Sequence, residues 1–232
     1  MSTVVQGMTT FLQWLFELSS MVGLPYYGVA IILFTVIIKL ILYPLTLKQT
    51  TSMRKMAELG PKMKELQKKY GKDKQKLQQK TMELYSKEKV NPYSGCLPIL
   101  LQLPVFFALY RTLMAFPFGQ DASAYFFGFN LTIAYGLGLN YHLILPLIAG
   151  GSTYLMTKVT SATTPKSSGA PAGAEQTQKF MLLFMPIFLA YIVATVPSGL
   201  GLYIVTMNLM SIAQTVYINK KIQRDKENLE AA

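Results

Sequence analysis

The fold is decided by residues 28–47, which read GVAIILFTVIIKLILYPLTL. The only charged residue in this run of 20 is Lys39. A helix of about 20 apolar residues crosses a hydrocarbon core about 30 Å thick, so the run predicts a transmembrane helix. Four further apolar stretches have 17 to 21 residues each, and they are 96–116, 141–157, 180–196 and 198–218. The sequence therefore predicts an all-α integral membrane protein with five transmembrane helices.

The composition agrees with this fold class. Hydrophobic residues are 51% of the chain and charged residues 14%, whereas charged residues are about 25% of an ordinary soluble domain. Cys96 is the only cysteine and His142 the only histidine. Because there is only one residue of each kind, an internal disulfide, a cysteine-built zinc site and a histidine pair for a metal are excluded. We expect no cofactor and no metal.

The basic residues predict the topology. Residues 1–38 and 112–157 contain no Lys or Arg, whereas residues 48–94 contain thirteen of the 22. Most of the others lie in the loop after the third predicted span and in the tail after the fifth. All basic segments fall on one side if the N-terminus is outside and the C-terminus cytoplasmic, as the positive-inside rule requires. The net charge of +11 is thus explained by topology, without sequence-specific nucleic-acid binding.

The segments outside the predicted spans differ in character. Residues 1–24 are apolar at helical spacing and predict an amphipathic helix on the outer face, with Trp14 at headgroup level. The alternative is a disordered tail. Residues 161–178 are rich in Pro, Gly, Ser and Ala, which indicates a flexible cytoplasmic loop. Residues 221–232 form a short basic tail.

The basic segment 50–90 predicts a cytoplasmic helical hairpin. Apolar residues recur every three or four positions on both sides of Gly71, and Asp73 is placed to cap the second arm. Pro61 must kink the first arm or restart it. The first arm offers a docking surface for anionic lipid headgroups, the ribosome or a targeting factor. Its basic residues are Arg54, Lys55, Lys62, Lys64, Lys68 and Lys69. The alternative is a solvated helical face.

Lys39 is the most informative single residue. A charge near the middle of the bilayer costs about 2.5–3.5 kcal/mol on insertion scales, so it marks a functional site by default. The alternative is that the long side chain snorkels toward the cytoplasmic interface. Thr35 lies one turn earlier on the same helix face. Other predicted spans supply Gln102, Thr195, Asn208, Ser211 and Gln214.

These polar residues allow two interpretations. Turned inward, they would enclose a hydrated cavity with a positive centre; alternatively, they are hydrogen-bonding links between helices. No acidic residue lies within a predicted span, and the motifs of zinc proteases, serine hydrolases and phosphate-binding loops are missing. An enzyme or an ATP-driven pump is therefore not expected.

Four stretches of the sequence, in this order, resemble the bacterial YidC family of membrane insertases, kin to mitochondrial and chloroplast insertases. They are IKLILYPLT at 38–46, TSMRKM at 51–56, KVNP through GCLP to QLP at 89–104, and PSGL to Tyr203, Asn208 and Leu209 at 197–209. Together they extend over most of the chain, from about residue 25 to 220.

The resemblance implies a five-helix core with a positively charged groove, open to the cytoplasm and to lipid but closed outside. Lys39 occupies the position where the family usually has arginine, which keeps the charge but loses the rigid five-donor fork. By position, Thr35 and Tyr203 line the groove and touch substrate, and Gln102 and Asn208 are further candidates.

The function implied is insertion of nascent membrane proteins into the lipid bilayer of a bacterial plasma membrane. The expected partners are these nascent proteins and the bilayer, with the ribosome, a targeting factor and the Sec translocon as further candidates. Two alternatives remain: a small anion channel or transporter that uses the same positive cavity, and a structural assembly subunit of a translocon.

Overall fold

The computed structural model describes residues 2–91, 97–115, 122–136, 138, 141–163 and 174–230. Its helices are α1 (Ser2–Met21), α2 (Tyr27–Ile41), α3 (Tyr43–Glu58), α4 (Gly60–Tyr70), α5 (Lys74–Lys87), α6 (Leu97–Ala115), α7 (Ile144–Thr163), α8 (Ala174–Thr195) and α9 (Ser198–Glu230). Short 3₁₀ turns occur at Ala122–Ala124 and Tyr141–Leu143. Strands β1 (Tyr125–Phe126) and β2 (Phe129–Asn130) pair antiparallel.

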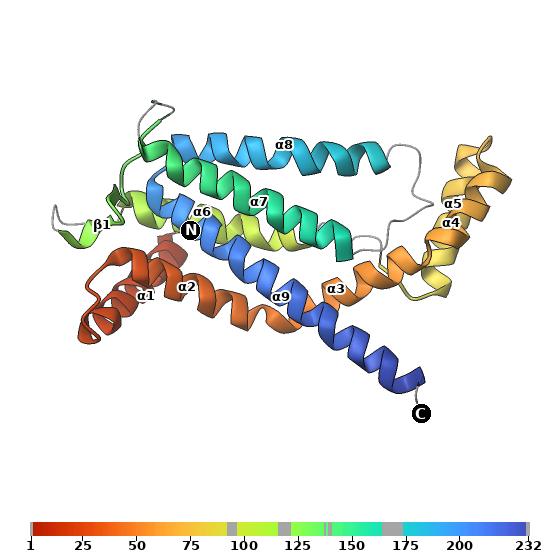
Figure 1. The fold of residues 1–232 in the computed structure, drawn as a ribbon, viewed down its shortest axis with the longest axis horizontal. Coiled ribbons are helices and arrows are strands. Elements are labelled where there is room, and N and C mark those ends of the chain that lie inside the picture. The colour runs from red at the N-terminus through yellow and green to blue at the C-terminus, as the bar shows by residue number, and fades with distance from the viewer. Residues whose placement is uncertain are drawn as a thin grey trace.

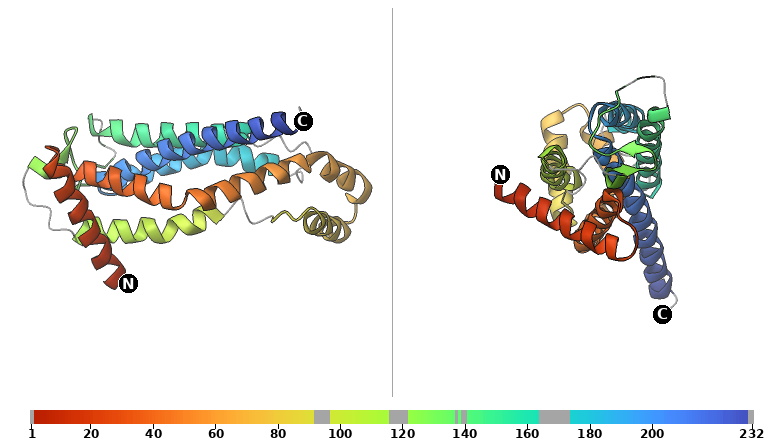
Figure 2. Two further views of the ribbon diagram at one scale, coloured as in Figure 1. Left: turned by 90° about the horizontal axis from the view of Figure 1, so that it is seen from below. Right: turned by 90° about the vertical axis from the view of Figure 1, so that its left-hand side faces the viewer.

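The long helices run lengthwise through the molecule (Figure 1). Helix α7 packs against α8 and α9, and α9 also packs against α2. Helix α1 and the two strands lie at one end, whereas the α4–α5 hairpin and the C-terminal end of α9 lie at the other. Figure 2 shows α1 crossing that end obliquely, with α6 beside it. The elements predicted to be outside and those predicted to be cytoplasmic thus occupy opposite ends.

Apolar side chains cover the outside of the bundle. Leu147, Leu183 and Ile187, on α7 and α8, are 68%, 68% and 66% exposed. Several polar side chains are buried instead, among them Thr35, Ser152, Thr153, Asn208, Ser211 and Gln214. An exposed apolar surface of this kind is suited to lipid, and buried polar side chains link transmembrane helices. The fold is that of an all-α, multi-pass membrane protein.

The first predicted span is not one continuous helix. Helix α2 ends at Ile41 and α3 begins at Tyr43, and the two axes differ by 59°. Pro44 lies in the first turn of α3; it has no N–H to donate and its ring obstructs a straight continuation, which is a common cause of a sharp helix bend. The span predicted over 28–47 is therefore bent at residue 42 and is not one straight helix.

Each of the other predicted spans has a helix in the described part of the chain. By length and hydropathy, Tyr141–Ser161 and Ser198–Asp225 are each able to cross a membrane, and the bent pair Tyr27–Ile41 and Tyr43–Met56 would be a third. Leu182–Thr195 is apolar but shorter. Five crossings remain a prediction.

The predicted hairpin is present, but it is shorter than expected. Residues 50–58 extend α3, and the antiparallel arms are α4 and α5. Pro61 lies in the first turn of α4, so of the two outcomes predicted for it, a kink or a restart, the structure has the restart. The prediction that Asp73 caps the second arm is confirmed, because its Oδ1 accepts a hydrogen bond from the Lys76 N–H at 3.0 Å.

The other predicted boundaries shift as well. Helix α1 covers most of 1–24; Leu12 and Leu15 pack into the core, while Trp14 is 53% exposed. The predicted flexible loop at 161–178 is helical at both ends, and residues 164–173 lie outside the described residues. The predicted tail at 221–232 is helical to Glu230, since no glycine or proline interrupts α9 there.

Candidate functional site

Lys39 lies at the contact between α2 and α9. Its Nζ donates a hydrogen bond to Ser211 Oγ at 2.6 Å, and Ser211 Oγ donates to the Met207 carbonyl at 2.7 Å. One turn further along α9, Gln214 Nε2 donates to the Lys39 carbonyl at 2.9 Å. Ser211 therefore positions the ammonium of Lys39, and Gln214 positions its backbone carbonyl.

The Lys39 ammonium has no carboxylate partner in the described part of the chain. The ion pairs found there join Lys62 to Glu88 and Lys80 to Glu83, both in the hairpin. A hydroxyl oxygen solvates the ammonium but does not neutralise it. The bundle thus holds a positive charge that an anionic group from another molecule would neutralise.

Tyr203 is buried in the same bundle, on α9, and is only 2% exposed. Its hydroxyl oxygen accepts a hydrogen bond from Gln102 Nε2 on α6. Thr35 is 1% exposed, and its hydroxyl donates to the Ile31 carbonyl of its own helix at 2.7 Å. The Gln102–Tyr203 contact is therefore a polar link between α6 and α9.

Asn208 takes part in a different contact, between α9 and α7. Its Nδ2 donates to Ser152 Oγ at 3.0 Å and to Thr153 Oγ1 at 2.8 Å. Both hydroxyls in turn donate to the Ala149 carbonyl. At 3.6 residues per turn, Asn208 lies about 140° around the helix from Tyr203. Of the five predicted groove residues, only Gln102 and Tyr203 contact each other through a hydrogen bond. Lys39, Thr35 and Asn208 each bond to other partners, and the hydrogen bonds of Asn208 are those of a link between helices.

Replacing Asn208 with leucine tests this structural role. We expect a loss of stability of about 0.6–1.7 kcal/mol, from the average to the maximum for interhelical hydrogen bonds in a membrane protein. Insertion per folded molecule should not change, because the Ser152 and Thr153 hydroxyls keep Ala149 as their acceptor. Thermal unfolding in detergent measures the loss of stability, and protease protection of an inserted test protein measures insertion. A fall in insertion at unchanged stability would instead indicate that Asn208 contacts the substrate.

Several buried polar atoms lack a hydrogen-bond partner among the described residues. Among them are Gln49 Nε2 on α3, and Gln214 Oε1, Asn219 Nδ2 and Asn219 Oδ1 on α9, a helix that α3 contacts. Each of the three side chains is less than 9% exposed. An unpaired buried polar group costs about 1–3 kcal/mol. Water, or the backbone of a bound polypeptide, has the hydrogen-bonding groups that these amides need.

Between the described helices of the bundle, two apolar cavities open to the surface of the protein. One of about 480 Å³ lies between α2, the β1–β2 hairpin, α7 and α9, and its lining includes Phe127, Tyr141 and Leu202. The other, of about 350 Å³, lies between α1, α2 and α6. Lys39 lines neither of the two. Both are suited to apolar chains and not to charged groups.

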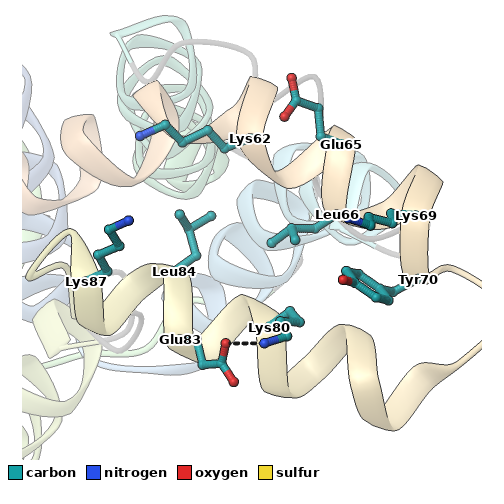
Figure 3. Close-up of a pocket in the computed structure, with 9 residues that line it drawn as sticks. All are labelled: Lys62, Glu65, Leu66, Lys69, Tyr70, Lys80, Glu83, Leu84 and Lys87. Carbon is teal, nitrogen blue, oxygen red and sulfur yellow. Dashed lines mark hydrogen bonds and ion pairs between the residues drawn. The ribbon is translucent and has the colours of Figure 1, made fainter.

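A third cavity lies in the hairpin, between α4 and α5 (Figure 3). Of the six basic residues predicted as a docking surface, Lys62 and Lys69 line it. Lys62 Nζ also pairs with Glu88 Oε1 at 2.5 Å, and this hydrogen bond lowers the pKa of the Glu88 carboxyl. Of the remaining four, Arg54 is half-buried, whereas Lys55, Lys64 and Lys68 are exposed.

Sequence reasoning missed two polar residues, Ser152 and Thr153. They follow Gly150 and Gly151 in an otherwise apolar span. Small and hydroxylic residues at this spacing are typical of contacts between membrane helices, so this signal was available. Ser211 and Gln214 were recognised as polar residues of the last span, but nothing in the sequence linked them to Lys39.

These features define a class: a multi-pass α-helical membrane protein with a lysine held inside its bundle. The chain belongs to the 60Kd inner membrane protein family, whose family model matches residues 17–226. A relative from Wolinella succinogenes is 37% identical over 215 residues, which are 93% of this chain and 37% of the relative. One from Francisella tularensis subsp. novicida is 38% identical over 226 residues, which are 95% of this chain and 38% of the relative.

Both relatives are named "Membrane protein insertase YidC". The chain spans less than two fifths of the length of these curated relatives. The similarity covers α2 to most of α9, and therefore includes Lys39 and all its hydrogen-bond partners.

Proposed function

We propose that this chain is a membrane protein insertase. The observation that carries the proposal is the Lys39 ammonium, held by Ser211 between α2 and α9 without a carboxylate partner among the described residues. A positive charge inside an apolar bundle is costly, and it is useful where an anionic segment has to be attracted into the membrane. The names of the relatives support the same function.

The mechanism involves no bond chemistry. A short polar or acidic segment of a nascent chain enters a hydrated groove from the cytoplasm and is attracted by Lys39. Thr35, Gln102 and Tyr203 line the groove, and the unpaired amides of Gln49 and Asn219 support its hydration. The groove shortens the apolar path, which reduces the desolvation cost of the segment's backbone and charges. The substrate's apolar helix leaves sideways into lipid, and its burial drives insertion.

The proposed orientation has the N-terminus outside and the C-terminus in the cytoplasm of a bacterial cell. In support, the α4–α5 hairpin and the C-terminal end of α9 lie at one end of the bundle, and α1 at the other (Figure 1). Residues 48–94, which include the hairpin, carry thirteen of the 22 basic residues, which favours the cytoplasmic side. Nascent membrane proteins are the proposed substrates, and the ribosome, a targeting factor and the Sec translocon are proposed partners.

Reconstitution tests the proposal directly. Liposomes containing only this purified chain are mixed with a newly synthesised single-span protein whose N-terminal tail must cross the membrane. We expect protease protection of that tail above the level of empty liposomes, without nucleotide. Insertion no better than in empty liposomes, with the chain folded and correctly oriented, would contradict the proposal. Anion leakage without protection would favour a channel instead.

A further inference from the structure

The hairpin contains a cleft that its own side chains do not fill. The cleft has a volume of about 560 Å³ and lies between α4 and α5. Its floor is apolar, formed by Leu66, Tyr70 and Leu84, and Figure 3 shows these side chains directed into the space between the helices. Leu66 and Tyr70 are one turn apart on α4, so they present a continuous apolar strip.

The two arms do not form a closed core by themselves. No residue of α5 is buried, and Met63 is the only buried side chain of α4. Helical layers are stable when their apolar faces are covered by another element. The floor of the cleft is therefore a surface against which a third helix can pack.

The rim of the cleft is positively charged. It includes Lys62, Lys69, Lys80 and Lys87 against two carboxylates, Glu65 and Glu83, so the formal charge is four minus two, or +2. Lys62 and Lys80 already form ion pairs. Lys69 and Lys87 form none with the described residues, although Lys69 Nζ lies 5.7 Å from the centre of the Tyr70 ring. The lining thus combines an apolar floor with lysines at both ends.

We propose that this cleft binds an acidic amphipathic helix of a partner protein. Apolar residues of that helix cover Leu66, Tyr70 and Leu84, while its carboxylates pair with Lys69 and Lys87. Helix α4 has 11 residues and is about 16 Å long at 1.5 Å per residue, which corresponds to about three turns of a bound helix. A lipid phosphate fits less well, because it has no apolar face to cover Leu66, Tyr70 and Leu84. This binding site is separate from the insertion activity, and binding of a helix to it can be measured without an insertion assay.

The test uses the full chain in nanodiscs of neutral lipid. The probe is a fluorescent 14-residue helical peptide with leucines on one face and glutamates on both flanks. We expect saturable binding by fluorescence anisotropy, and much weaker binding of a peptide with lysine in place of each glutamate. Lys69→Glu with Lys87→Glu should reduce affinity by about tenfold or more, because two attractive charge pairs become repulsive ones. Leu84→Gln should also weaken binding.

The matched control is Lys72→Glu with Lys74→Glu. It makes the same change of charge at exposed positions that do not line the cleft, so affinity should change much less. If the two double variants lowered the affinity for the peptide equally, the peptide would be attracted to the basic hairpin in general, and the proposal would be overturned. Displacement of the peptide by nanodiscs containing phosphatidylglycerol, lost in the Lys69→Glu, Lys87→Glu variant, would assign the cleft to lipid headgroups and overturn it as well.

Discussion

Lys39→Met is expected to lower the insertion of a substrate with an acidic outer segment by about tenfold or more. Methionine keeps the length of the side chain and removes its charge. A hydrogen bond to a charged group contributes about 1.5–3 kcal/mol, and each 1.4 kcal/mol corresponds to about tenfold. The measurement is the initial rate of protease protection in liposomes, with the amount of folded protein matched between variants.

The stability of the same variant gives an independent check. An unpaired charge inside the bilayer costs about 2.5–3.5 kcal/mol, so Lys39→Met should unfold at a higher temperature than the original chain while inserting less. Lys39→Arg should retain insertion, because it retains the charge. A substrate with an uncharged outer segment should be nearly unaffected. Undiminished insertion of the acidic substrate by Lys39→Met would exclude the electrostatic part of the mechanism.

Gly150→Leu is expected to destabilise the bundle by about 1–3 kcal/mol, the usual effect of overpacking. A Cβ at this position would lie 3.1 Å from the Ala190 Cβ and 3.1 Å from the Pro186 carbonyl oxygen. The second contact is with the backbone of α8, which cannot rotate away as a side chain can. The larger side chain must therefore separate α7 from α8. Thermal unfolding in detergent measures the effect.

The adjacent glycine supplies the matched control. Gly151 is exposed, and a Cβ there would meet nothing within 4 Å. Gly151→Leu should therefore be neutral or slightly stabilising, because glycine in a helix interior costs about 1 kcal/mol relative to alanine. If the two variants lowered the unfolding temperature equally, the close approach of α7 and α8 would not be what stabilises this part of the bundle.

The helices of the bundle could be predicted because their signal is local. A run such as 28–47 must be helical in lipid, since each backbone polar group needs a partner within the segment. The break after Ile41 was harder to predict. Pro44 is visible in the sequence, but membrane helices often tolerate proline, and whether one bends depends on neighbouring helices. The continuation of α9 to Glu230 was not predicted, because the apolar run ends near residue 218 and hydropathy marks the end of a span and not the end of a helix.

The candidate site could be predicted only in part, for a related reason. Lys39 is prominent because it is a charge in an apolar run, whatever surrounds it. The partners of a polar residue depend on which helices are neighbours and on their rotation, and periodicity within one helix contains neither. Asn208 therefore could not be assigned to α7, nor Ser211 to Lys39, before the helices were placed together.

The bend between α2 and α3 also has a mechanical consequence. It lies three residues after Lys39, at Leu42, and the α4–α5 hairpin follows it along the chain. Gln214 holds the Lys39 carbonyl on the bundle side of this bend. Helix α2 is thus held against α9, whereas α3 leads away at an angle of 59°. The bend between them lies less than one helical turn from Lys39 itself. A force exerted on the hairpin by a bound partner would therefore act, through α3, on the turn of α2 that carries the Lys39 ammonium.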